Sequence, residues 1–516
     1  MTGFDPLGQL SGRRRVNVPT PGRSASRPPA ARGDAAPRKQ ISSIRRLPPP
    51  ALFFAALAVT SATLLAACQE GATPSLPPRT GSVRDDAFLD TLEHRTFQFF
   101  WDFTNPQTGM TPDRVPHTYF ASAAAVGFSL TAFGIGAERG YVPRDSAAQR
   151  VLNTLNLLWS APQGPQPDGC SGYRGYFYHF LKISTGVRFD EQVELSSMDT
   201  ALLLAGVLFC QSYFDRDIYQ ERTIRSLADS ICRRVEWTWL QARPPLIAMG
   251  WFPERGVHHL DWQGYNEAMM VYILALGSPT HPVGAGAWKE WTASYRFEDF
   301  YGQRYVTFGP LFGHQYTHCW IDFRGIQDEY MRQRGIDYFE NSRRATYAQR
   351  AYAMKNPRKF SGYSENIWGL TACDGPAQVL REINGRTVQF LTYGARGVSP
   401  DYWVDDGTIA PTAAAGSIAF APEIAIPALK AMRNRYGERI WTPYGFLDAF
   451  NPTYTTEATG PDGWVDEDYL GIDQGPILLM AENFRTGLVW KTMRKNPYIR
   501  RGLTNAGFSG GWLDHE

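Results

Sequence analysis

The chain has 516 residues, with 52 basic and 50 acidic side chains, and aromatic residues make up 14% of it. The basic excess sits in residues 1–50, which hold ten basic and two acidic residues. The rest of the chain therefore carries 42 basic and 48 acidic residues, a net charge of −6. This balance argues against nucleic acid as a partner, and no phosphate-binding or dinucleotide-binding motif predicts a cofactor.

The N-terminal segment predicts export. An uncharged apolar run of 17 residues, 51–67, follows the basic segment and matches the core of a signal peptide. It ends in Leu-Ala-Ala-Cys68, which resembles a bacterial lipobox, in which the cysteine is lipidated and becomes the mature N-terminus. We expect residues 1–68 to be a leader and the protein to be a periplasmic lipoprotein anchored to the outer membrane. The alternative is a plain signal peptide or a short anchor helix.

Residues 69–81 predict a flexible tether, and residues 82–516 a single catalytic domain. The tether contains Pro, Gly and Thr, and no linker, charge block or short repeat interrupts the composition after it. Five cysteines follow Cys68, so at least one of them is unpaired, and none has the spacing of zinc ligands. We expect no obligate protein partner.

The predicted helices of this domain are of two kinds. Nearly all positions are apolar in 121–137, 198–210, 267–276, 412–420 and 476–483, whereas 146–159, 221–240, 343–354 and 424–436 are amphipathic. Helices that are apolar all round belong inside a large fold, and amphipathic helices cover it. The alternation predicts an all-α fold, an (α/α) barrel with an inner and an outer ring of helices, long loops and a few short strands.

Three acidic residues lie near the starts of apolar helices: Asp199, Glu267 and Asp473. In an (α/α) barrel the inner helices run in one direction, so their N-termini gather at one mouth, where the helix dipoles favour negative charge. We therefore expect these carboxylates to meet at one rim, although about 270 residues separate the first from the last.

Glu267 is the leading candidate for a general acid. It follows Asn266, a good N-cap residue, and Trp251, Trp262 and Tyr265 lie close to it in the sequence. An aromatic cleft desolvates a carboxyl group and raises its pKa, as a general acid requires. The alternative is an acid that complements the helix dipole.

The other two acids have equally plain structural alternatives. Asp473 precedes Gly475-Pro476, and Pro476 is expected at the first helical position, so Asp473 is a cap, a base that activates water, or a ligand for a sugar hydroxyl. Ser196-x-x-Asp199 matches a capping box. Either Asp199 or the preceding loop acid Glu194 is a candidate for a direct role.

Three further patterns are weighed against known motifs. His314, His318 and Asp322 are spaced four residues apart, as on one helix face of a metal site, but no metalloprotease motif accompanies them. We expect no metal there and favour hydroxyl recognition. Asp405 and Asp406 are interpreted as a turn in the cleft, because the EF-hand spacing is absent. The Gly-x-Ser-x-Gly pattern at 507–511 lacks the strand–helix context of a nucleophile elbow.

Loops rich in Gly and aromatic residues, such as 309–325 and 361–376, suit carbohydrate, because flat rings stack on sugar faces. The predicted substrate-binding residues are Trp251, Trp262, Tyr265, Asn266, His314, Gln315, His318, Trp320, Asp322, Arg324, Arg343, Arg344, Trp368, Asp405, Asp406 and Gln474. For the charged members, a structural network of ion pairs is the alternative.

Long motifs occur in a characteristic order at 97–101, 127–140, 264–268, 277–282, 313–318, 337–344, 371–376, 405–411 and 471–476. Together they resemble the glycoamylase-like superfamily, over about residues 97–502. That group includes glycoside hydrolase family 144, the bacterial β-1,2-glucanases, and a domain of cyclic β-1,2-glucan synthases.

The resemblance implies an (α/α)6 barrel that cleaves β-1,2-glucan internally with inversion. It places the general acid on Glu267, with Asp473 as the candidate base, acting directly or through a water or hydroxyl relay, and Asp199 as a further cleft carboxylate. The alternatives are an exo-acting enzyme that releases sophorose, a transglycosylase, and a non-catalytic glycan-binding lipoprotein.

Overall fold

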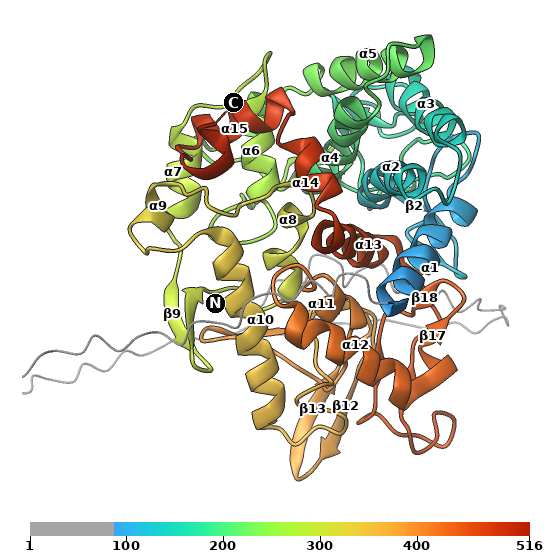
Figure 1. The fold of residues 1–516 in the computed structure, drawn as a ribbon, viewed down its shortest axis with the longest axis vertical. Helices are drawn as coiled ribbons and strands as arrows, with labels where there is room; N and C mark the ends of the chain where they lie inside the picture. Colours follow the sequence, from blue (N-terminus) through green and yellow to red (C-terminus); the bar gives the residue numbers. More distant parts are fainter. Residues whose placement is uncertain (1–86, 516) are drawn as a thin grey trace, which may run out of the picture. The chain divides into compact units, whose positions relative to one another are not determined.

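Helices that are apolar on every side form the inner ring of the fold. The computed structural model describes residues 87–515. The inner helices are α2 (Ala123–Glu138), α4 (Ser197–Tyr213), α6 (Met269–Gly277), α8 (Tyr316–Trp320), α11 (Pro411–Ala415) and α13 (Gly471–Arg485). Helix α2 packs against α4 and α13, α4 packs against α6, and α13 packs against α8 and α11 (Figure 1). Their side chains are almost all buried, so this ring is the core.

Helices with one polar face form the outer ring. They are α1 (Ala87–Phe103), α3 (Arg144–Ser160), α5 (Tyr219–Arg233), α7 (Gly286–Thr292), α10 (Tyr338–Lys355) and α12 (Pro422–Tyr436). In Figure 1, α3 and α5 lie outside α2 and α4, against which they pack. The short helices are α9 (Glu329–Arg332), α14 (Leu488–Met493) and α15 (Pro497–Asn505), and α15 packs on α6. The predicted (α/α)6 barrel is confirmed.

Three predicted helix starts are wrong. Helix α10 begins at Tyr338 rather than at residue 343. Helix α6 begins at Met269, so Glu267 lies in the turn before it. Helix α13 begins at Gly471, so Pro476 is inside the helix rather than at its first position. A short strand that ends at Leu470 fixes where α13 begins, and such pairing is invisible in a helical hydrophobicity pattern.

Two-residue strands lead directly into three inner helices. Strand β2 (Ala121–Ser122) precedes α2, β6 (Leu195–Ser196) precedes α4, and β21 (Tyr469–Leu470) precedes α13. Their antiparallel partners are β5 (Phe180–Leu181), β7 (Gly250–Phe252) and β1 (Arg114–Val115), respectively. In the last pair Arg114 lies opposite Leu470. These pairs fix the N-terminal ends of the inner helices and the loops beside them.

The remaining short elements edge the loops. The strands are β3 (Gly172–Tyr173), β4 (Tyr176–Phe177), β8 (Gly256–Val257), β9 (Phe297–Phe300), β10 (Gln303–Val306), β11 (Ala372–Cys373), β12 (Val379–Ile383), β13 (Arg386–Phe390), β14 (Gly394–Ala395), β15 (Gly397–Ser399), β16 (Tyr402–Val404), β17 (Trp441–Thr442), β18 (Gly445–Phe446), β19 (Phe450–Asn451) and β20 (Trp464–Val465). The 3-10 helices are η2 (Trp237–Leu240), η3 (Leu311–His314), η4 (Gly437–Arg439) and η5 (Gly511–Leu513).

Helices α2 and α4 approach each other closely through glycine. A Cβ atom on Gly127 would lie 2.2 Å from the carbonyl oxygen of Leu202, and one on Gly206 would lie 2.0 Å from that of Gly127. Neither position has room for a side chain, because the obstacle is backbone. This contact brings the starts of α2 and α4 together at the same mouth.

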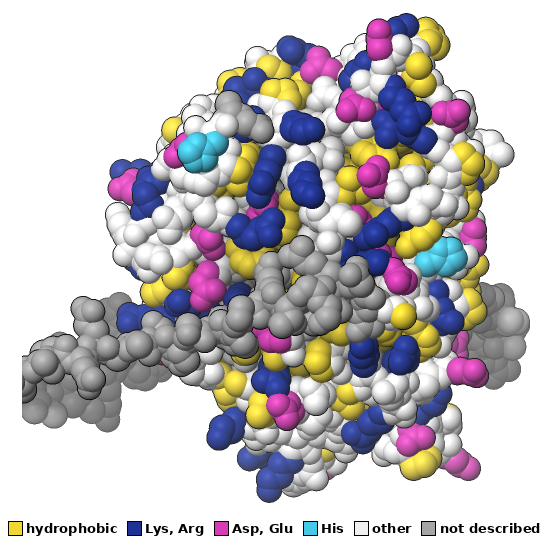
Figure 2. Space-filling view, in the orientation of Figure 1, with side chains coloured by type: hydrophobic (Ala, Val, Ile, Leu, Met, Phe, Trp, Pro, Cys, Tyr) yellow, Lys and Arg dark blue, Asp and Glu magenta, His cyan; other side chains and the backbone are white. Residues whose placement is uncertain are grey.

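The five cysteines among the described residues are buried and free, so none of them forms a disulfide. None of the helices in residues 87–515 is both long enough and apolar enough to cross a membrane. Cys68, the residues before it and the predicted tether lie outside the described residues. On the face drawn in Figure 2, basic side chains are interspersed with acidic and apolar ones.

Candidate active site

The N-terminal ends of the inner helices bring the three predicted acids together. Tyr316 begins α8 and lies between them: burial raises the pKa of its hydroxyl, and so do the charges of Asp473 and Glu267. The charge of Asp199, in the first turn of α4, raises the pKa of Glu267. These interactions place Asp199 near Glu267, and Tyr316 near both Glu267 and Asp473.

Glu267 is held between two inner helices. Asn266 Oδ1 accepts a hydrogen bond of 3.0 Å from the Ala268 N–H, and Thr317 Oγ1 of α8 donates one of 3.5 Å to the Glu267 carbonyl. Burial raises the pKa of the Glu267 carboxyl to about 7, against the effect of its own backbone N–H. Near neutral pH this carboxyl therefore keeps a proton part of the time, as a general acid must.

His179 bridges two acids beside Glu267. Its Nδ1 lies 2.8 Å from Glu194 Oε1, and its Nε2 lies 3.4 Å from Asp199 Oδ1. Burial alone would lower the pKa of His179, but the charges of Asp199 and Glu194 raise it to about 10. The ring is therefore an imidazolium at neutral pH, which donates to Glu194 and forms an ion pair with Asp199.

Ser196 caps the start of α4, which is half of the predicted capping box. Its Oγ accepts a hydrogen bond of 3.1 Å from the Asp199 N–H and donates one of 2.6 Å to Asp199 Oδ2. In a full capping box the Asp199 carboxyl would accept from the Ser196 backbone N–H rather than from its hydroxyl. Asp199 thus bonds to the cap residue, pairs with His179 and lies near Glu267.

A second cluster of acids surrounds Asp473 in the first turn of α13. Asp448, from the loop before β19, hydrogen-bonds to Asp473 through its side chain, and the Asp374 N–H donates to Asp448 Oδ2 at 2.7 Å. Burial raises the pKa of Asp448, Asp473 and Asp374. This cluster contains more carboxyl groups than the region around Glu267.

Arg114 of β1 is the guanidinium that bonds to this cluster. Its Nη1 donates to Asp374 Oδ2 at 2.6 Å and lies 3.5 Å from Asp468 Oδ2, and its Nε donates to Asp113 Oδ2 at 3.4 Å. Asp468 also accepts from the His117 ring at 2.9 Å. The six carboxyl groups of this cluster, which are Asp113, Asp374, Asp448, Asp466, Asp468 and Asp473, thus share one arginine.

Two sets of side chains approach the geometry of a metal site. One oxygen or nitrogen atom from each of His179, Glu194 and Asp199 lies within 4.8 Å of the others, and the same holds for Asp374, Asp448 and Asp466. Both nitrogens of the His179 ring are committed to carboxylates, and Asp374 is committed to Arg114. Hydrogen bonds and ion pairs account for the first set and for Asp374 of the second, and we assign neither set a metal.

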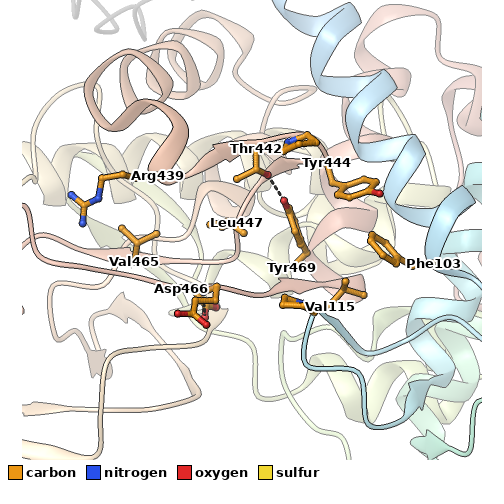
Figure 3. Close-up of a pocket in the computed structure, with 12 residues that line it drawn as sticks. Phe103, Val115, Arg439, Thr442, Tyr444, Leu447, Val465, Asp466 and Tyr469 are labelled. Atoms are coloured by element: carbon orange, nitrogen blue, oxygen red, sulfur yellow. Dashed lines mark hydrogen bonds between the residues drawn. The ribbon is translucent and has the colours of Figure 1, made fainter. Parts of the chain in front are cut away.

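An open hollow of about 640 Å³ lies beside the second cluster (Figure 3). Val115 and Tyr469, paired across β1 and β21, line it together with Phe103 and Tyr444, and Tyr469 hydrogen-bonds to Thr442. Its aromatic and polar lining is of the kind that accommodates sugar rings. Asp466 lines the hollow and also belongs to the acid cluster.

Four predicted substrate-binding residues lie in or close to the Glu267 segment. Trp251 of β7 lies opposite Leu195 of β6, directly before α4, and Trp262 Nε1 donates to Ser197 Oγ at 2.9 Å. Asn266 adjoins Glu267, whereas the Tyr265 ring is buried and packs against His314. Trp262 and Asn266 keep some exposure.

Six others are buried inside the barrel: His314, Gln315, His318, Trp320, Trp368 and Gln474. Gln315 donates to Ala413 O and Ser417 Oγ, Trp320 donates to Thr131, and Gln474 donates to Phe446 O. Burial lowers the pKa of both histidines to about 3, so they are neutral. These side chains join the barrel walls, and the structure leaves them almost no surface for a sugar.

No single helix carries His314, His318 and Asp322, which lie in the segment predicted as a loop. His314 ends the 3-10 helix η3, α8 covers only Tyr316–Trp320, and Asp322 follows it in extended chain. The three side chains therefore do not form one helix face. Asp322 pairs with Arg324 and Arg494 beside the end of α13, which is opposite to the end that carries Asp473.

The other charged candidates form ion pairs and hydrogen bonds within the fold, as the alternative interpretation stated. Arg343 donates to Phe420 O and Glu423, and Arg344 donates to Glu340. Asp406 accepts two bonds of 2.8 Å from Arg396, and Asp405 accepts from Tyr352 and Tyr363. The structure does not bring their charged atoms to the acids of the mouth.

The sequence interpretation missed the residues that surround the acids. Asp113, Arg114, His179, Asp374 and Asp448 lie in loops or on two-residue strands, where no periodicity marks them. Asp374 stands within the motif at 371–376, which is the one signal that could have identified it. For His179 the sequence holds no signal that we recognise.

Comparison with known proteins agrees with this geometry. Residues 259–497 match the family described as "Putative glucoamylase". A "putative glucoamylase" from Bacteroides uniformis, known from a crystal structure, is 31% identical in sequence to this chain, and the two structures align with a TM-score of 0.72. The alignment covers 83% of this chain and 98% of the Bacteroides uniformis chain. The endo-β-1,2-glucanase from Chitinophaga pinensis is 28% identical with a TM-score of 0.71, over 83% of this chain and 99% of that one.

A curated relative has a longer chain. The exo β-1,2-glucooligosaccharide sophorohydrolase of Parabacteroides distasonis is 27% identical over 460 residues, which are 82% of this chain. The match spans 58% of that relative's length. The Bacteroides uniformis protein is 31% identical to this chain over nearly its whole length. This chain therefore belongs to the same family, the glycoamylase-like proteins.

Proposed function

We propose that this protein is a glycoside hydrolase that cleaves β-1,2-linked glucan. The proposal is supported by Glu267, which stands in the turn before an inner helix near Asp199 and has a pKa that burial raises to about 7, and by Tyr316, which lies near both Glu267 and Asp473. Glycoside hydrolysis needs a proton-bearing acid and a second carboxylate across the scissile bond. The β-1,2 linkage comes from what the relatives in Chitinophaga and Parabacteroides are named for.

The proposed reaction inverts the anomeric centre. Glu267 gives its proton to the glycosidic oxygen as the C–O bond breaks, and water adds to the anomeric carbon from the opposite face. The proton of that water passes to Asp473, directly or through a second water or a sugar hydroxyl. Inverting enzymes hold the two carboxyl groups roughly 6.5–9.5 Å apart, or further with a relay.

The residues around Glu267 keep its proton available. The negative charge of Asp199 raises the pKa of Glu267, and the His179 imidazolium keeps Asp199 in place. The ring of Trp262, bonded to Ser197, stands at the same helix start. Asp199, held by His179, thus helps to set the proton affinity of Glu267.

We favour internal cleavage over release of sophorose from a chain end. The endo-acting Chitinophaga pinensis enzyme is matched over 99% of its chain, whereas the exo-acting relative is matched over 58% of its length. Incubation with linear β-1,2-glucan, followed by chromatography, separates the cases. A ladder of oligomers supports internal cleavage, sophorose alone supports the exo alternative, and rearranged lengths support a transglycosylase.

The test of Glu267 uses a matched pair of variants. We expect Glu267→Gln to lower kcat on β-1,2-glucan about 10²- to 10⁴-fold, since an amide cannot donate the proton. Glu290→Gln, in an exposed position of α7, is the control and should retain full activity. An active Glu267→Gln would remove Glu267 from the mechanism, and tight glucan binding by an inactive wild type would support a glycan-binding protein.

We also propose that the protein is exported and lipidated at Cys68. The support is the apolar run 51–67 with its Leu-Ala-Ala-Cys68 end. Membrane fractions of cells that express wild type or Cys68→Ala test this proposal. We expect the wild type in the outer-membrane fraction and the variant in the soluble periplasm, and equal distributions would refute the anchor.

A further inference from the structure

Three carboxylate oxygens of the acid cluster have no hydrogen-bond donor among the described residues: Asp448 Oδ1, Asp473 Oδ2 and Asp466 Oδ2. The first two belong to residues adjacent in space that are each 2% exposed. A buried charged oxygen without a donor is costly. Each of these two atoms therefore needs a proton, a cation or a water that the protein alone does not supply.

The two side chains contact each other. A side-chain hydrogen bond joins Asp448 to Asp473, while the other oxygen of Asp448, Oδ2, accepts the Asp374 N–H at 2.7 Å. An ionised carboxylate accepts hydrogen bonds and donates none. The contact is therefore a hydrogen bond only if one of the two acids retains its proton, and two adjacent buried carboxylates do not both ionise readily.

The surrounding groups do not remove this need. Facing the pair are the carboxyls of Asp113, Asp374, Asp466 and Asp468, the hydroxyls of Tyr316 and Tyr393, the thiol of Cys373, the guanidinium groups of Arg114 and Arg396, and the ring of His117. Arg114 bonds to Asp374 and Arg396 bonds to Asp406. A glucan is neutral, so it brings no charge to balance the acids.

We propose that Asp448 is a positioning residue that retains a proton at neutral pH and donates it as a hydrogen bond to Asp473. This bond fixes one oxygen of Asp473 and favours the ionised form of its carboxylate, leaving the other oxygen to accept the proton of the attacking water. The catalytic part of this inference rests on the proposed function, but the protonated state of Asp448 does not.

The direction of the bond follows from the two environments. Burial raises the pKa of Asp448, and the bond to Asp473 raises it further. Burial also raises the pKa of Asp473, but the bond from Asp448 works against that effect. Asp448 is therefore the donor and Asp473 the acceptor.

A divalent cation held by Asp374, Asp448 and Asp466 is the rival explanation, because their oxygens lie within 4.8 Å of one another. Arg114 opposes it, since a guanidinium 2.6 Å from Asp374 Oδ2 repels a cation at the same carboxylate. The backbone N–H on Asp448 Oδ2 also occupies one of the oxygens that a cation would need.

Infrared spectroscopy tests the proton without reference to activity. At neutral pH the difference spectrum of wild type minus Asp448→Asn should contain the carbonyl stretch of a protonated carboxyl, whereas wild type minus Asp217→Asn, a nearly fully exposed control, should not. The difference spectrum removes the bands of other protonated acids such as Glu267 and Asp466. A difference spectrum without that band would overturn the inference. So would a wild-type band that disappears, with a rise in Tm, when millimolar Ca²⁺ is added.

Kinetics test the positioning role. Asp448→Ala removes the donor, so kcat should fall about 10- to 100-fold and the acid limb of the kcat/KM profile should move to higher pH. Asp448→Asn supplies an amide donor, so it should restore most of kcat at unchanged KM. Wild-type kcat and an unmoved acid limb in Asp448→Ala would overturn the inference. If the wild type cleaves no glucan, the proposed function fails and the infrared band decides this inference alone.

Discussion

The two ends of helix α13 differ in how far positive charge balances the buried carboxylates beside them. At its N-terminal end Asp473 lies among five other carboxyls that share Arg114, and burial raises its pKa. Beside its C-terminal end Asp322 lies between Arg324 and Arg494, which hold the pKa of Asp322 below its usual value against the effect of burial. One helix thus connects a site of unmatched charge with a site of matched charge.

This difference distinguishes acids with a structural role from acids that can exchange a proton near neutral pH. A buried acid matched by guanidinium groups is satisfied at all pH values where the protein is folded, and it has no proton to give or take near neutrality. Unmatched acids cost stability and titrate near neutral pH, and such groups mark functional sites. The mouth that carries Asp473, and not the far end, is therefore where catalysis is expected.

Removing the unmatched acid should break function and spare stability. We expect Asp473→Asn to lower kcat about 10²- to 10⁴-fold, because an amide cannot take the proton of water. Its Tm should stay equal or rise, since the change removes a carboxyl from a crowded acidic cluster. Chromatographic assays and calorimetry on the same preparations check both. A large loss of Tm with retained kcat would reverse the assignment of the two ends.

Removing the matched acid should have the converse effect. Asp322→Asn leaves Arg324 and Arg494 without a charged partner, and we expect a loss of about 1–3 kcal/mol in the free energy of unfolding. The value is modest because both guanidinium groups keep contact with water. Urea unfolding measures this loss, and kcat should be unchanged. A drop in kcat without loss of stability would place Asp322 in the substrate path.

The pH dependence should follow the acid at the mouth. With a pKa of about 7, Glu267 must be protonated to act, so kcat/KM should fall as pH rises through about 7. The pKa of Glu267 lies above its ordinary value of 4.5, so the folded protein binds the extra proton. Its contribution to stability is therefore lost as pH rises from about 4.5 to about 7.

Asp199→Asn sharpens this test. The charge of Asp199 raises the pKa of Glu267, so its removal should move the alkaline limb of kcat/KM to lower pH, by about one pH unit. Ser196 still caps α4 through the backbone N–H of residue 199, which separates this effect from a loss of the helix. An alkaline limb that stays in place would show that another group controls it.

The hydrophobic periodicity of the sequence predicted which helices are buried and at which end their acids lie. Helix α4 is buried along almost its whole length, so its apolar run marks it as an inner helix, and the parallel inner ring then brings Asp199 and Asp473 to one end. The start of α13 was misplaced because the pairing of Leu470 with Arg114, about 350 residues away, fixes it. No local pattern contains that information.

The same limit explains the site residues. His318 and Trp320 stand in a polar, aromatic segment that suggests a sugar site, yet α8 turns both inward, where Ser342 and Thr131 bond them. His179 and Asp448 carry no local sign of function, because their partners come from distant loops. Composition indicates that a segment binds something polar, and only the tertiary contacts decide whether that is a ligand or the protein itself.

The smallest effect is expected where the sequence interpretation and the structure differ most plainly. Arg344 was predicted to bind substrate, but its Nε donates to Glu340 one turn away on the partly exposed face of α10, at 2.7 Å. Such a pair contributes about 0.3–0.5 kcal/mol. Arg344→Ala should therefore change Tm slightly and leave KM for β-1,2-glucan unchanged, as substrate titrations of the variant and the wild type will show. A clear rise in KM would mean that the glucan reaches α10, and that the contrast between the two ends of α13 does not by itself define the binding surface.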